Sequence, residues 1–144
     1  MKFAVNLDRV FAAPRSKVYR AWLDPNVLAR WMGPDGFAVT LATVDERVGG
    51  RHEVELLDAE GAHHSFTSVI EELVPDERIV LRFKFHWDAE ETLLRITLRD
   101  AEGGGTALHL EHEKITRTHP LDETSVNEGW SQTLAKLQAL LEQP

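Results

Sequence analysis

The chain has 144 residues, of which 42% are apolar and 28% charged, and 16 Lys and Arg against 24 Asp and Glu give a net charge of −8. This length is typical of one domain that buries a core without disulfide or metal staples, so we expect residues 1–144 to form a single domain. The absence of cysteine excludes disulfide scaffolds, iron–sulfur clusters and thiol catalysis, and the acidic balance argues against nucleic acid or an anionic membrane as a partner.

The N-terminal segment predicts a strand followed by two short helices. Apolar and polar residues alternate over 3–11, as in a half-buried strand. Pro14 suits a first helical turn, and Asp24 with Pro25 begins a second helix as N-cap and first-turn proline. The apolar run at the start is too short for a secretory signal, and no stretch approaches the roughly 18 apolar residues of a membrane span. We therefore expect a cytoplasmic protein with no membrane-inserted segment.

The middle of the chain reads as six strands. Apolar residues alternate with polar ones in five segments, namely 37–41, 52–56, 79–87, 94–98 and 108–112. Residues 63–74 change parity partway, which predicts a bulge in that strand. Because short turns join the successive strands, the sheet is expected to be antiparallel.

The last segment predicts a long helix from about Pro120 to Glu142, capped near His119. Its apolar residues recur at helical spacing, at Val126, Trp130, Leu134, Leu137 and Leu141. Gly129 within the helix indicates a close approach to the sheet. The economical assembly is an α+β fold in which a curved antiparallel sheet wraps around this helix, because each has one apolar face.

Motifs for nucleophilic, phosphate or metal chemistry are missing. The sequence has no G-x-S-x-G, G-x-G-x-x-G, Walker or H-E-x-x-H motif. His109 and His112 are three residues apart on a predicted strand, so their side chains face opposite sides of the sheet. The adjacent His63 and His64 also face opposite sides, so neither pair can bind one metal ion. Spacing within one strand does not test a metal site assembled across strands, for example from His52, His64 and His112, and this possibility stays open. We expect no metal and no cofactor.

Several polar residues share a strand face with core residues. His52, Ser68, Glu72 and His112 are of this kind, and a buried polar group without a partner costs roughly 1–3 kcal/mol. Each could pair with a neighbour or water, or together they could line a mostly apolar cavity. A buried Glu72 near a histidine could also do acid–base work. Trp31, at the end of the second short helix, is a candidate for the cavity mouth, or else a cap packed under Trp130.

The order and spacing of short motifs over nearly the whole chain resemble one family. They are Phe11-Ala12-Ala13-Pro14, Val18-Tyr19-Arg20-Ala21-Trp22, Asp24-Pro25, Arg30-Trp31, Gly33-Pro34, Val48-Gly49-Gly50, 72–80, Gly105-Thr106, His112-Glu113 and Gly129-Trp130. The family is that of the activator of heat-shock-protein-90 ATPase homologues, in the START-like (SRPBCC) superfamily. The resemblance implies a helix-grip fold with a hydrophobic cavity between sheet and C-terminal helix. At His52 the sequence departs from the family, in which an aromatic commonly follows the Gly-Gly turn.

From the inward polar positions and the resemblance we predict a binding module for a small hydrophobic or amphipathic ligand, such as a lipid, sterol or polyketide. The expected ligand-binding residues are Trp31, His52, Val54, Phe66, Ser68, Glu72, Phe83, Phe85, His112, Trp130 and Leu134. The first alternative is a cyclase- or dehydratase-type enzyme using His52, Glu72 or His112. The second is a chaperone-interacting module, which requires a contiguous exposed apolar patch. The oligomeric state is left open.

Overall fold

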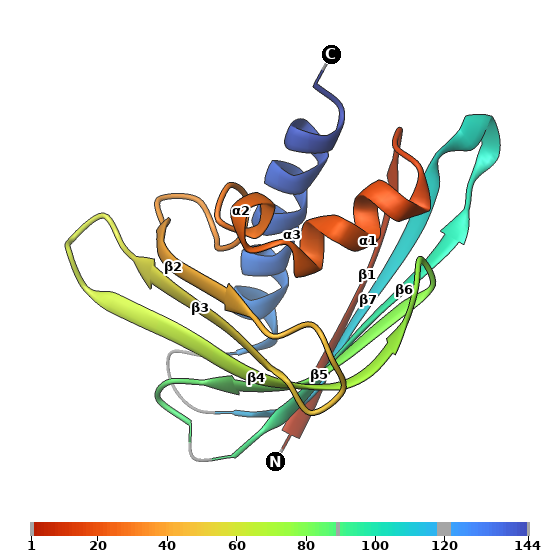
Figure 1. Ribbon diagram of the computed structural model, residues 1–144. Helices are drawn as coiled ribbons and strands as arrows, with labels where there is room; N and C mark the ends of the chain where they lie inside the picture. The colour runs from red at the N-terminus through yellow and green to blue at the C-terminus, as the bar shows by residue number, and fades with distance from the viewer. Residues whose placement is uncertain (1, 89, 118–121, 144) are drawn as a thin grey trace.

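The main element of the computed structural model is a curved antiparallel sheet, which has seven strands within the described residues 2–88, 90–117 and 122–143 (Figure 1). The elements in chain order are β1 (Lys2–Phe11), α1 (Arg15–Leu23), α2 (Pro25–Leu28), β2 (Ala38–Val44), β3 (Arg51–Leu57), β4 (His63–Val74), β5 (Arg78–Phe85), β6 (Thr92–Asp100), the 3₁₀ turn η1 (Glu102–Gly104), β7 (Thr106–Thr116) and α3 (Glu123–Leu141). The sheet order is β1-β7-β6-β5-β4-β3-β2, so β1 and β2 form the two edges. The predicted α+β fold, with two short helices after the first strand, is confirmed.

Capping residues mark the N-terminal ends of α2 and α3. The Asp24 side chain accepts a hydrogen bond from the Asn26 amide at 2.9 Å and caps α2, as predicted. That helix ends at Leu28, so Trp31 lies in the following turn and not in the helix. Asp122 caps α3 in a reciprocal capping box with Ser125. The expected cap near His119 and the start at Pro120 lie outside the described residues.

A bulge in β4 decides which side chains at its end face inward. The pairing of β4 with β5 shifts register between Ile70 and Glu72, as the parity change predicted. Ile70 before the shift is buried, whereas Glu72 after it is half-exposed and Leu73 packs against the core. The prediction that Glu72 shares the buried face was therefore wrong, because the extra residue turns it away.

The core lies between the concave face of the sheet and α3, which runs across that face (Figure 1). The predicted stripe on the last helix is confirmed: Val126, Trp130, Leu134, Leu137 and Leu141 are all buried. Among the described helices, none combines the length and the apolar character needed to cross a membrane.

Candidate functional site

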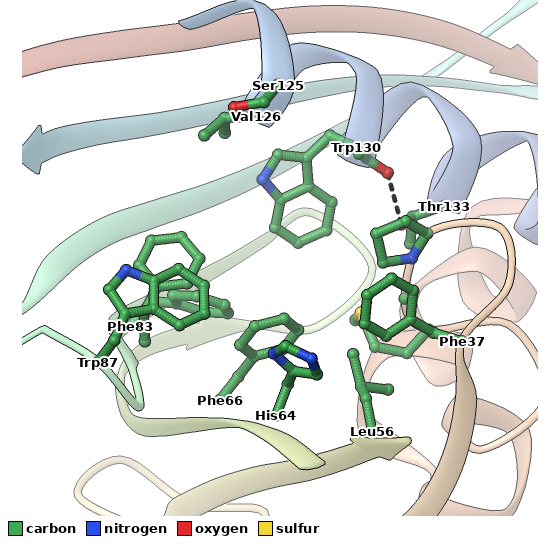
Figure 2. Close-up of a pocket in the computed structure, with 15 residues that line it drawn as sticks. Phe37, Leu56, His64, Phe66, Phe83, Trp87, Ser125, Val126, Trp130 and Thr133 are labelled. Carbon is green, nitrogen blue, oxygen red and sulfur yellow. Dashed lines mark hydrogen bonds between the residues drawn. The ribbon is translucent and has the colours of Figure 1, made fainter. Parts of the chain in front are cut away.

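A cavity of about 140 Å³ lies between β3 to β5, α3 and the loop after α2 (Figure 2). Its described lining is mostly apolar and comprises Met32, Gly33, Pro34, Phe37, Leu56, His64, Phe66, Phe83, Phe85, Trp87, Ser125, Val126, Gly129, Trp130 and Thr133. An apolar cavity with a few polar groups is the usual composition of a small-molecule site.

Aromatic rings form much of the wall. Phe66, Phe83 and Phe85 come from β4 and β5, with ring centroids 5.1 Å apart for Phe66 and Phe83 and 5.1 Å apart for Phe83 and Phe85. Trp130 of α3 approaches Phe83 with a centroid separation of 6.3 Å. These are the expected site residues that the structure places on the cavity surface.

The remaining expected residues do not line the cavity. Trp31 is 1% exposed, packs edge-on against Trp22 with centroids 4.7 Å apart, and donates from Nε1 to the Ala21 carbonyl at 3.0 Å. It is a core residue and not a residue of the cavity mouth. Val54 and Leu134 are also buried core residues beyond the cavity lining.

His112 holds Trp130 in the wall through a buried chain of hydrogen bonds. The Trp130 indole, which can only donate, gives its Nε1–H to His112 Nδ1 at 3.0 Å. A neutral His112 therefore carries its hydrogen on Nε2 and donates to Thr92 Oγ1 at 2.7 Å, and the Thr92 hydroxyl donates to the Phe83 carbonyl at 2.7 Å. Burial lowers the pKa of His112 to about 3, so the ring is neutral at physiological pH. His112 is not among the residues that line the cavity, and its contact with the wall is the hydrogen bond to Trp130.

His52 and Ser68 lie opposite each other on β3 and β4, and neither is among the residues that line the cavity. His52 is buried and donates from Nε2 to the Trp22 carbonyl at 2.8 Å, and burial lowers the pKa of this histidine. Ser68 is 1% exposed, and its Oγ has no hydrogen-bond partner within the described part of the chain. His52 is thus a satisfied core histidine.

Glu72 lies apart from both histidines. It pairs with Arg78, whose Nε donates to Glu72 Oε1 at 2.7 Å, and about two-fifths of each side chain is exposed. General acid–base catalysis needs at least two groups within hydrogen-bond reach of one reacting point. Glu72, His52 and His112 each bond to separate partners and none of them lines the cavity, so this arrangement does not support the proposed acid–base role.

Several cavity residues were missed by the sequence predictions. His64 has the same strand parity as Phe66 and Ser68, and Trp87 continues the parity of Phe85, so alternation could have found both. Phe37 begins the alternation over 37–41, but β2 starts at Ala38, so Phe37 lies in the loop that follows α2. Its place in the wall depends on tertiary packing.

α3 holds the loop after α2 over the cavity. Gln132 Oε1 accepts from the Asp35 amide at 3.1 Å, and Lys136 Nζ donates to the Pro34 carbonyl at 3.3 Å. Burial lowers the pKa of Lys136. A Cβ added at Gly129 would meet Pro34 Cγ at 3.6 Å, an ordinary contact. The expected close approach at Gly129 is therefore to this loop and not to the sheet.

Metal ligands are not clustered in the described residues. No group of three or more His, Cys, Asp or Glu side chains there could hold a metal ion. In particular, His64 lines the cavity, whereas His52 and His112 lie outside its lining with other partners.

Comparison with known proteins places this chain and its fold in one family. The family described as Activator of Hsp90 ATPase homolog 1-like protein matches residues 12–142. A crystal structure from Chromobacterium violaceum is 36% identical, with a TM-score of 0.88 and 99% of each chain covered. A structure from Rhizobium leguminosarum is 22% identical, with a TM-score of 0.85 and 99% and 95% coverage of this chain and of that chain. The AHSA1 protein of Silicibacter pomeroyi is 24% identical, with a TM-score of 0.76 and 96% and 97% coverage. The two latter likenesses concern the fold alone.

Among curated proteins no match was found. The family match nonetheless covers most of the chain, and the sheet wrapped around α3 is the arrangement that the resemblance in the sequence implies. The chain belongs to the family of Activator of Hsp90 ATPase homolog 1-like proteins.

Proposed function

We propose that the protein binds a small hydrophobic or amphipathic molecule in the cavity between its sheet and α3, without transforming it chemically. The observation that carries the proposal is the aromatic wall of Phe66, Phe83, Phe85 and Trp130 around an open apolar space. Side chains that merely completed a core would close such a space, because protein interiors are close-packed.

The size of the cavity limits the ligand. Drug-sized molecules occupy sites of roughly 300–1,000 Å³, and an apolar cavity of about 150 Å³ accommodates benzene. With about 140 Å³, this cavity takes a group the size of one ring or a short branched chain. A whole sterol or polyketide requires that the walls move, so we propose a ring-sized apolar body as the part that is buried.

The chaperone-interacting alternative has less support. Large exposed apolar residues include Val10 on β1 and Leu41 on β2, which belong to opposite edges of the sheet, so these two do not form one patch. Trp87 is 46% exposed but belongs to the cavity rim. These positions favour a ligand cavity over a continuous docking face.

Filling the cavity tests the proposal directly. We expect benzene to shift NMR signals of the cavity residues, and native mass spectrometry of the protein from its own cells to detect a retained small molecule. Gly129→Leu places a side chain into the cavity wall and should abolish the shifts. Asn127→Leu, on the exposed side of the same helix, is the matched control and should leave them unchanged. Binding that survives Gly129→Leu, or no binding of any small apolar probe, contradicts the proposal.

A further inference from the structure

His64 differs in kind from the rest of the cavity wall. Within the described lining it is the only side chain with an ionisable group. Three of the other polar groups there already have partners: the Trp130 indole bonds to His112, the Thr133 hydroxyl donates to the Gly129 carbonyl at 2.7 Å, and Ser125 belongs to the capping box. The fourth, the indole of Trp87, is on the rim, where the residue is 46% exposed, and it can only donate. A polar group of a bound molecule therefore finds its best partner at His64.

Asp58, in the turn between β3 and β4, orients this histidine. One carboxylate oxygen accepts from the amides of Glu60 and Ala62, both at 2.9 Å, and the other accepts from His64 Nε2 at 2.9 Å. The hydrogen bond from His64, with those from the backbone amides, holds the pKa of Asp58 below its ordinary value. The backbone amides of the turn thus hold the Asp58 carboxylate in one position, and the carboxylate holds the His64 imidazole in one orientation.

Neighbouring rings hold the imidazole in place from other sides. Phe37 and His86 each lie with ring centroids 5.3 Å from that of His64. Figure 2 shows His64 beside Phe66 and Leu56, across the cavity from Trp130. The ring has limited freedom to turn away, and such preorganisation reduces the cost of binding.

The direction of the Asp58 bond determines what His64 offers. A carboxylate only accepts, so the hydrogen of neutral His64 is on Nε2 and Nδ1 is a hydrogen-bond acceptor. Within the described part of the chain, the hydrogen bonds of His64 involve Nε2 and its backbone, and none reaches Nδ1. Because His64 lines the cavity, a free acceptor on its ring favours a ligand with a hydrogen-bond donor, and the nearby Asp58 carboxylate disfavours an anion.

We propose that the His64–Asp58 pair is the polar recognition site of the cavity, and that the ligand is a ring-sized apolar molecule carrying a neutral hydroxyl group, as in a phenol. This inference rests on the proposed function. The ring occupies the aromatic part of the cavity, and its hydroxyl donates to His64 Nδ1. Asp58 is a positioning residue, because it acts only through the tautomer of His64.

Benzene, phenol and benzoate test the proposal, since they share a ring and differ in the polar group. NMR titrations should show phenol binding about five- to tenfold more tightly than benzene, the gain expected for one net hydrogen bond, and benzoate binding most weakly. His64→Phe should remove the preference for phenol while retaining benzene. Where that variant does not fold, the His64 Nδ1 resonance of the wild-type protein decides: it should shift much further with phenol than with benzene, because only phenol donates a hydrogen bond to this nitrogen.

Asp58→Asn tests the positioning role by a readout that stability alone does not change. With the Asp58 oxygen that accepts from Nε2 replaced by an NH₂ group, His64 should move its hydrogen to Nδ1, which long-range ¹H–¹⁵N spectra report directly. Phenol should then lose its advantage over benzene in a folded protein. Retention of the Nε2–H tautomer in this variant overturns the assigned role.

The outcomes separate this inference from the proposed function. If benzene and phenol bind equally to the wild type and to His64→Phe, the cavity is a ligand site but His64 is not its recognition group. If benzoate binds most tightly, the site takes anions and the proposed neutral hydroxyl is wrong. If none of the probes binds, both proposals fail.

Discussion

Replacing Thr92 by Val tests whether the buried chain from Trp130 to Phe83 is as important as its geometry indicates. Thr92 is 2% exposed, and its hydroxyl links His112 Nε2 to the Phe83 carbonyl with two contacts of 2.7 Å. Valine has the same shape but no hydroxyl. The substitution therefore leaves the His112 Nε2–H without an acceptor and removes a donor from the Phe83 carbonyl, with no new cavity.

The expected destabilisation follows from these lost partners. A buried polar group without a partner costs about 1–3 kcal/mol, and two groups in one network do not add fully, so we expect about 2–4 kcal/mol for Thr92→Val. Thr92→Ser is the matched control, since it retains the hydroxyl and removes only one methyl group. It should cost about 1 kcal/mol.

Urea unfolding at pH 7.5 measures both variants. Near-UV circular dichroism of the folded proteins should also change more for Thr92→Val, because His112 then no longer holds the Trp130 indole in one orientation. If Thr92→Val is as stable as Thr92→Ser, the hydrogen-bond chain contributes little and the reasoning is refuted.

Three further predictions concern other parts of the molecule. Because burial lowers the pKa of His112 to about 3 from 6.5, only the unfolded chain takes up this proton between those values, and stability falls as pH falls through 6.5. Between pH 7.5 and 5.5 the free energy of unfolding of the wild type should fall by about 1.4 kcal/mol more than that of His112→Gln. Glutamine is the control because its amide can donate and accept hydrogen bonds but does not titrate. Equal losses of the two proteins in urea unfolding would contradict this prediction. Gly129→Ala should raise stability by about 1 kcal/mol, because alanine favours a helix interior and its Cβ makes an ordinary contact with Pro34, and a lower melting temperature contradicts this. Glu72→Gln should change the free energy of unfolding by less than about 1 kcal/mol and leave benzene binding unchanged, since the pair with Arg78 is exposed; a loss of benzene binding measured by NMR would restore Glu72 to the site.

Periodicity was sufficient for the strands and for the stripe on the last helix, because alternation and helical spacing are properties of neighbouring residues. The same local reading found Phe66, Phe83, Phe85 and Trp130 as cavity residues. The same reading also assigned to a cavity the polar residues that share a strand face with core residues. Local information is not sufficient for that assignment. Parity tells which face a side chain is on, but it does not tell how far along the strand the packed core ends and the open space begins.

Tertiary structure decided those depths and partners. His52 and His112 became core histidines because Trp22 and Trp130 lie against them, and the bulge after Ile70 turned Glu72 away from the buried face. His64 became the polar group of the cavity because the loop after α2 and the β3–β4 turn meet at its ring. Contacts of this kind join residues far apart in the chain, so no spacing within one element encodes them. The sequence by itself determined which elements form, and their packing determined which side chains a ligand can reach.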